Sequence, residues 1–170
     1  MPCLWWADAR GLATHMGYDD TYDSGEDYVR EMVATHLNAA GTPFTCVSRT
    51  SEKGRDIVVH STPRRIIEIK GYPSARVSRG ANRGKLKAEP KRRLQAQGWI
   101  WDAIRQLYEH HATTPDDELA IGLPARPFYR SYMIRFAVLR TKLSLFVYLV
   151  LSDGTVVPVP PTHAIPTTVA

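Results

Sequence analysis

Apolar and polar residues follow a helical period near the beginning of the chain. Between Ser24 and Ala40, apolar residues recur every three to four positions, behind acidic residues that suit the positive end of a helix. Ser24 is a residue type that caps helices, Gly41 is typical of a helix end, and Pro43 prevents continuation. The pattern therefore predicts a helix over residues 24–40.

Short apolar runs separated by turn residues follow and predict strands. Early in the chain these runs are Phe44–Ser48, Asp56–His60 and Arg65–Lys70, and later ones are Glu118–Leu123, Leu143–Leu151 and Val156–Val159. Helical spacing returns over Lys91–His110, with Leu94, Trp101, Ile104 and Tyr108 as the expected apolar stripe, and over Pro127–Lys142.

The resulting order is α-β-β-β-α-β-α-β-β. Three tightly joined strands predict an antiparallel meander, whereas strands separated by helices require crossovers, so the sheet should be mixed. We expect an α/β fold with a mixed central sheet flanked by helices, in a single domain over residues 1–159. The segment 160–170, rich in Pro and Thr, is expected to be a flexible tail.

Composition places the chain among soluble globular proteins. It has 170 residues, 44 % of them apolar, which suffices for one core. No run of apolar residues is long enough to span a membrane, and the opening residues lack the basic head of a secretory signal. Cys3 and Cys46 have no other metal-ligand residues at the spacing of a metal site. They are therefore expected to be free thiols, as in proteins of a reducing compartment. We therefore expect a cytoplasmic protein with no membrane partner.

Positive charge is concentrated in one segment. Residues 76–93 carry a net charge of +7, whereas the rest of the chain sums to −2. The basic residues are Arg76, Arg79, Arg83, Lys85, Lys87, Lys91, Arg92 and Arg93. This concentration is the electrostatic footprint expected for binding nucleic acid, although a solvated basic loop would have the same composition.

The segment Ile66–Gly71 combines an apolar strand with two charged residues. Alternate residues of a strand share a face, so Glu68 and Lys70 should point the same way while Ile67 and Ile69 point to the other layer. If the two strands pair as a hairpin, Asp56 lies near both. Two carboxylates beside an ammonium can hold Mg²⁺ or Mn²⁺ and offset charge on a phosphate. A cross-strand salt bridge to Lys70 from Asp56 or Glu68 is the structural alternative.

These residues and their spacing resemble the PD-(D/E)XK nuclease superfamily, whose core has the α-β-β-β-α-β order. By that resemblance Asp56 and Glu68 are the two acids that bind the metal, and Lys70 is the catalytic lysine. Arg55 stands where the motif usually has proline. Many members also carry a metal-binding glutamate on the first helix. Glu26 and Glu31 are the candidates, and the spacing of Glu26 from the apolar stripe favours Glu26.

A second resemblance lies on the following helix. Gln95 and Trp99 are similar to the Q-x-x-x-Y element of the recombination-exonuclease branch, with Trp in place of Tyr. This resemblance implies that Gln95 reaches a phosphate or the metal-bound water, in the same cavity as the helix acid. Alternatively, Trp99 is a core aromatic and Gln95 a surface residue. Residues 55–159 more widely resemble a group of bacterial proteins regarded as restriction-endonuclease-like.

The residues thus predict a Mg²⁺-dependent deoxyribonuclease acting on duplex or single-stranded DNA, in restriction, repair or phage defence. A nucleic-acid-binding module without turnover and a subunit of a larger complex, with Leu143–Leu151 as its interface, are the alternatives. A homodimer or a partner subunit is compatible with each of them. No Gly-rich phosphate-binding motif is present, so we expect no nucleotide cofactor.

Overall fold

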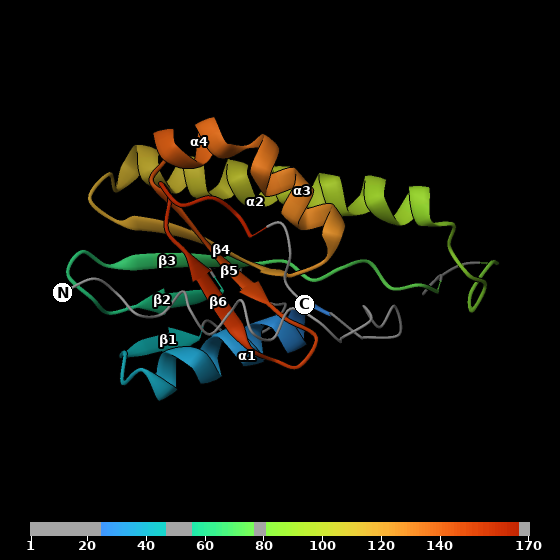
Figure 1. Ribbon diagram of the computed structural model, residues 1–170, viewed down its shortest axis with the longest axis horizontal. Coiled ribbons are helices and arrows are strands. Elements are labelled where there is room, and N and C mark those ends of the chain that lie inside the picture. The colour runs from blue at the N-terminus through green and yellow to red at the C-terminus, as the bar shows by residue number, and fades with distance from the viewer. Residues whose placement is uncertain (1–24, 47–55, 77–80, 167–170) are drawn as a thin grey trace.

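A computed structural model describes residues 25–46, 56–76 and 81–166. In these ranges, six strands form one sheet between helices on both faces (Figure 1). The elements are α1 (Glu26–Ala39), β1 (Phe44–Cys46), β2 (Ile57–Val59), β3 (Arg65–Ile69), α2 (Glu89–Thr113), β4 (Glu118–Pro124), α3 (Pro127–Arg135), α4 (Ala137–Lys142), β5 (Leu145–Val150) and β6 (Val156–Val159).

The strands lie in the sheet in the same order as in the chain. Strands β1, β2 and β3 form an antiparallel meander, β4 and β5 each run parallel to the preceding strand, and β6 is antiparallel to β5. The parallel steps coincide with the helical crossovers through α2 and through α3 and α4. The predicted mixed sheet flanked by helices is therefore confirmed.

Strand β5 lies between β4 and β6, and most of its side chains are buried. The alternative in which Leu143–Leu151 serves as an interface with a partner does not fit this burial. This apolar run is needed to build the interior of the domain, which explains its composition.

Each face of the sheet has its own hydrophobic core. Ile67 and Ile69 of β3 pack with Val29, Val33 and Leu37 of α1. On the opposite face, Ile66 belongs to the core formed with α2, α3 and α4. Full burial of each such side chain contributes about 1.5–3 kcal/mol relative to exposure. The period-two alternation of β3 thus attaches different helices to its two faces.

Helix α2 packs through a different stripe from the one the sequence predicted. Leu94, Trp101 and Tyr108 are exposed, and only Ile104 of the expected stripe is buried. The buried positions are Ala96, Ile100, Ala103, Ile104, Leu107 and His110. Small alanines allow the helix to lie close to the sheet, so the largest apolar residues need not mark its inner face. The helix also begins earlier than expected, with Pro90 in its first turn.

The predicted helix over Pro127–Lys142 is divided at Phe136 into α3 and α4. The Phe136 ring packs edge-on against Trp101 and Tyr132, with ring centroids 5.0 Å apart in both pairs. These contacts hold Phe136, at the boundary between the two helices, against α2 and α3.

The expectation of a loose tail is wrong for residues 160–166. Ile165 is buried in the core beside α2, and the buried Arg140 guanidinium donates hydrogen bonds to the carbonyls of Pro160 and His163. Residues 167–170 lie outside the described part of the chain. No helix among the described residues is long and apolar enough to cross a membrane.

Candidate active site

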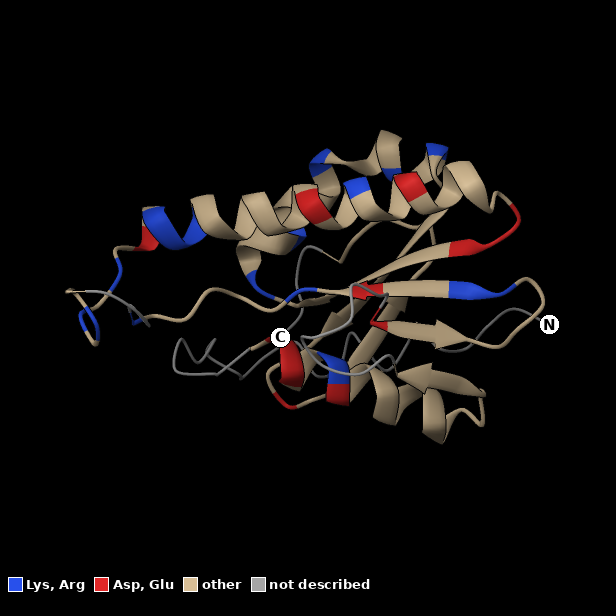
Figure 2. Ribbon diagram, turned by 180° about the vertical axis from the view of Figure 1, so that it is seen from behind, with Lys and Arg blue, Asp and Glu red and all other residues tan. Residues whose placement is uncertain are grey.

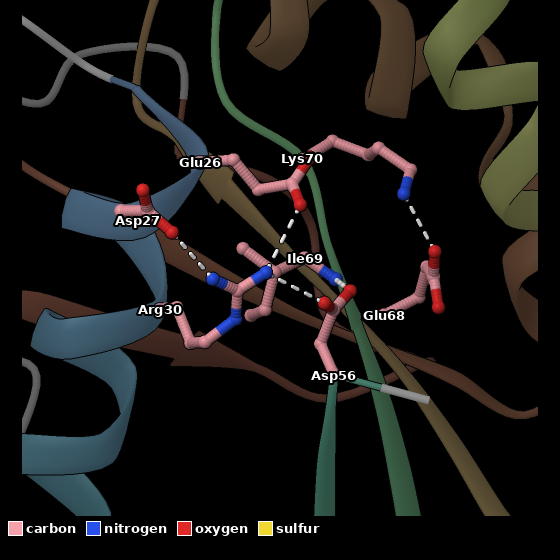
Figure 3. A network of polar contacts seen from close by, with 7 residues as sticks. All are labelled: Glu26, Asp27, Arg30, Asp56, Glu68, Ile69 and Lys70. Atoms are coloured by element: carbon pink, nitrogen blue, oxygen red, sulfur yellow. Dashed lines mark hydrogen bonds and ion pairs between the residues drawn. The ribbon is translucent and has the colours of Figure 1, made fainter. Parts of the chain in front are cut away.

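Asp56 lies at the junction of α1, β2 and β3. Directly after it, β2 pairs with β3 in the register Ile57 to Ile67, which brings Asp56 beside the end of β3. Its Oδ2 accepts the backbone N–H of Ile69 at 2.7 Å, and its Oδ1 accepts a hydrogen bond from Arg30 Nη2 at 2.8 Å (Figure 3). Asp56 therefore ends the β2–β3 pairing and connects it to α1.

Glu68 on β3 and Lys70, directly after the strand, extend their side chains to the same side, as predicted. Their side chains form an ion pair with 2.5 Å between Lys70 Nζ and Glu68 Oε1. Glu68 is only 5 % exposed, and 13 % of the Lys70 side chain is exposed. Asp56 pairs with Arg30 and Glu68 with Lys70, so each acid has its own cation (Figure 3). Glu68 and Lys70 thus form the ion pair named by the structural alternative, but it joins residues two positions apart and does not bridge two strands.

The carboxylates act on one another electrostatically. Burial raises the pKa of Glu68; the positive charge of Lys70 lowers it, and the negative charges of Asp56 and Glu26 add to the increase. Burial by itself lowers the pKa of Arg30, but its contacts with Asp56, Glu26 and Asp27 outweigh burial, so the pKa is raised. Three carboxylates therefore share one electrostatic environment, in which two basic side chains supply the compensating charge.

Helix α1 and the end of β3 meet through backbone contact at Gly71. A Cβ atom at this position would lie 2.3 Å from the backbone nitrogen of Glu26. This close approach brings the first residue of α1 next to the lysine. The Glu26 carboxylate accepts a hydrogen bond from Arg30 at 3.0 Å in an ion pair, and Glu26 lines a cavity together with Lys70. Glu31 is exposed and does not line this cavity.

The predicted core-facing position of Glu26 requires correction. The buried residues of α1 are Val29, Val33 and Leu37, whereas the Glu26 side chain remains substantially exposed. Glu26 stands in the first turn, where the helix extends beyond the core and reaches the end of β3. The preference for Glu26 over Glu31 agrees with its position in the cavity.

The segment after Lys70 is held by polar and aromatic contacts. The buried Tyr129 hydroxyl donates to the Gly71 carbonyl at 2.7 Å, and the Lys70 N–H donates to the Gly122 carbonyl at 2.9 Å. The Tyr72 ring contacts the guanidinium groups of both Arg92 and Arg126, and its hydroxyl donates to Glu89. Burial and the bond to Glu89 raise the pKa of Tyr72 to about 12. These contacts fix the backbone that carries the lysine.

The cavity beside Lys70 has a volume of about 300 Å³. Its lining residues are Glu26, Lys70, Trp99, Asp102, Arg105 and Gln106. The predicted position of Gln95 in this cavity is wrong, because Gln95 is exposed one turn away and accepts a hydrogen bond from Lys87 Nζ at 3.3 Å. Trp99 does line the cavity, and the sequence did not identify Asp102, Arg105 or Gln106.

The described part of the basic segment after residue 80 projects beyond the sheet at one end of the molecule (Figure 2). Arg83, Lys85, Lys91 and Arg93 are exposed, whereas Arg92 is held against Tyr72 and donates to the Pro73 carbonyl. Arg76 is also exposed and donates to the Gly84 carbonyl at 2.8 Å, and Lys87 is partly buried. The structure thus leaves most of this positive charge accessible to a polyanion. Arg79 lies outside the described residues.

Arg30 is a site residue that the sequence reasoning missed. It joins Asp56, Glu26 and Asp27 and thereby neutralises the side of the site opposite Lys70. Its spacing of four residues from Glu26 and three from Asp27 indicated helical ion pairs. The contact with Asp56, 26 positions away, could not be read from that spacing.

Comparison of the chain with protein-family models, curated proteins and solved structures finds no match.

Proposed function

We propose that this protein is a metal-dependent nuclease with a restriction-endonuclease-like fold, which hydrolyses phosphodiester bonds of DNA. The observation that carries the proposal is the grouping of Asp56, Glu68 and Lys70 at the end of β3, with Glu26 beside them. The order α1-β1-β2-β3-α2-β4 agrees with the core implied by the sequence resemblance.

The donor set suits a hard divalent cation. Carboxylate oxygens are the ligands preferred by Mg²⁺, and Glu26, Asp56 and Glu68 supply them within one electrostatic environment. In the observed arrangement, no three described Asp, Glu, His or Cys residues are grouped closely enough to hold a metal ion. Arg30 pairs with two of the carboxylates, so a cation bound by Asp56 and Glu26 would compete with the Arg30 guanidinium. Bound Mg²⁺ would supply a water of lowered pKa and charge neutralisation at the phosphate.

The protein's own side chains have separate roles in this proposal. Lys70 lines the cavity and presents a largely buried ammonium that stabilises charge developing on the phosphate. Glu68 orients Lys70 through their ion pair. The exposed cations of the basic segment bind phosphates on either side of the reacting group, because they begin within a few residues of Lys70.

The decisive test is a cleavage assay on plasmid and single-stranded DNA with Mg²⁺, Mn²⁺ or EDTA. We expect metal-dependent cleavage by the wild-type protein, with a loss of about 10²–10³-fold in Lys70→Ala, the size typical of removing one electrostatic stabiliser. Lys142→Ala is the matched control, because Lys142 is an exposed lysine at the end of α4. Equal cleavage by both variants would contradict the role of Lys70.

A nucleic-acid-binding module without turnover is the second candidate. It is favoured by the full use of both Asp56 oxygens and by the lack of a ready metal-binding group among the described residues. Mn²⁺ titration followed by calorimetry separates the two candidates. DNA binding without Mn²⁺ binding or cleavage would favour the module, whereas Mn²⁺ binding that is lost in Asp56→Ala supports the nuclease.

A further inference from the structure

The cavity beside Lys70 is lined along one side by a stripe of α2. Trp99, Asp102 and Gln106 follow at intervals of three and four residues, which places them on one face of the helix. Lys70 and Glu26, which come from other parts of the chain, also line it. The site of the proposed reaction therefore continues directly into a compartment with an aromatic ring and several hydrogen-bonding groups.

We propose that this cavity binds one unpaired nucleotide of the nucleic-acid strand, an inference that rests on the function proposed above. The base stacks on the indole of Trp99 and its edge faces Asp102 and Gln106. The adjoining phosphate lies toward Lys70 and Arg105. The cavity thereby selects single-stranded segments or strand ends as the part of the substrate next to the reactive group.

The size of the cavity limits what it can accept. Ligand sites range from about 300 to 1,000 Å³, so a cavity of about 300 Å³ lies at the lower end of that range. This volume suits a single nucleotide better than a stretch of duplex. A base within a duplex is stacked on both sides, so only an unpaired or extruded base can present its face to an indole.

The polar side chains of the cavity match the chemistry of a nucleotide. The Gln106 amide both donates and accepts hydrogen bonds, and the Asp102 carboxylate accepts from exocyclic amino groups such as that of cytosine. Arg105 is exposed and pairs with Glu109 at 2.7 Å on the same helix. Exposed pairs of this kind contribute little free energy, so the guanidinium can exchange Glu109 for a phosphate at little cost.

The test is fluorescence anisotropy of a labelled oligonucleotide in EDTA, as a single strand and as a blunt duplex of the same sequence. Stacking on one aromatic residue contributes about 1–3 kcal/mol per base, which corresponds to roughly 5- to 150-fold in affinity. Trp99→Leu should weaken single-strand binding by this amount and leave duplex binding unchanged. Trp101→Leu is the matched control, because Trp101 is 47 % exposed, packs on Phe136 and does not line the cavity.

Two further variants protect the test against a folding defect in Trp99→Leu. Trp99→Phe keeps an aromatic face and should retain most single-strand affinity, whereas Gln106→Ala, at an exposed position, should lower it without unfolding the protein. An equal effect of Trp99→Leu on single strand and duplex, or no effect on either, would overturn the inference. If the Trp99 effect is found and the protein cleaves no nucleic acid, the nucleotide site stands and the hydrolase proposal fails.

Discussion

Asp56 and Arg30 form an ion pair of 2.8 Å that joins helix α1 to the beginning of β2. Both side chains are mostly buried, and the second Asp56 oxygen accepts the N–H of Ile69. The acid that the sequence motif assigns to metal binding therefore also holds two elements of the fold together.

From this relationship we predict that Asp56→Ala destabilises the fold. Removing the carboxylate leaves the Ile69 N–H without its acceptor and leaves Arg30 with only the more exposed Glu26 and Asp27, at a cost of about 1–3 kcal/mol. Asp27→Ala is the matched control, because Asp27 pairs with the same arginine but is 90 % exposed, and should cost at most about 1 kcal/mol. Urea unfolding measures both losses in the free energy of unfolding. Equal losses would contradict the prediction, because they would show that the buried contacts of Asp56 stabilise the fold no more than the exposed contact of Asp27.

Glu68 should make the folded protein more stable as the pH falls below neutral, whereas an acid with a lowered pKa would make it less stable. Its pKa in the folded protein is raised above the usual value of 4.5, mainly by burial. The folded state therefore binds the proton more tightly, so Glu68 contributes more stability as pH falls from neutral through the raised pKa. Glu68→Gln imitates the protonated acid.

We accordingly expect Glu68→Gln to gain stability relative to the wild type near pH 7, and this advantage to disappear at low pH, where Glu68 is protonated in both states. Thermal unfolding of the two proteins from pH 4 to pH 8 measures the difference. A relative stability of Glu68→Gln that falls as pH rises would contradict the raised pKa.

Gly71→Ala should disrupt the contact between α1 and β3. The added methyl group would lie 2.3 Å from the backbone nitrogen of Glu26, so one of the two elements must move. Overpacking of this kind costs about 1–3 kcal/mol, and the movement should also lower any activity that depends on Glu26. Gly98→Ala supplies the contrast, because its methyl group would meet nothing within 4 Å. At that exposed helical position, alanine should stabilise the protein by about 0.5–1 kcal/mol.

The basic segment should determine how DNA binding responds to salt. Replacing Arg83 and Lys85 together with alanine removes two exposed cations, and should reduce the slope of log affinity against log salt on duplex DNA by roughly 1.8. Replacing Arg135 and Lys142, exposed at the ends of α3 and α4, removes the same charge elsewhere and should change the slope little. Equal slopes for the two double variants would mean that the segment is only solvated.

The sequence by itself determined the α/β architecture. Period-two alternation in β3 separated Ile67 and Ile69 from Glu68, and the observed cores agree with that separation. Three closely spaced strands followed by helical crossovers predicted the mixed sheet, because short turns permit only antiparallel pairing. The local spacing from Asp56 to Glu68 and Lys70 likewise predicted which charged residues lie together at the end of β3.

Only the tertiary structure decided how those charges are paired and what surrounds them. Asp56 contacts Arg30 and not Lys70, because the close backbone approach at Gly71 brings α1 against the strand end. The inner face of α2 is set by small alanines that fit against the sheet, which the hydrophobic pattern did not reveal. Trp99 lines the cavity, whereas Gln95 lies one turn nearer the start of α2 and is outside it. Such contacts depend on how neighbouring elements pack, and residue spacing within one element carries no information about that packing.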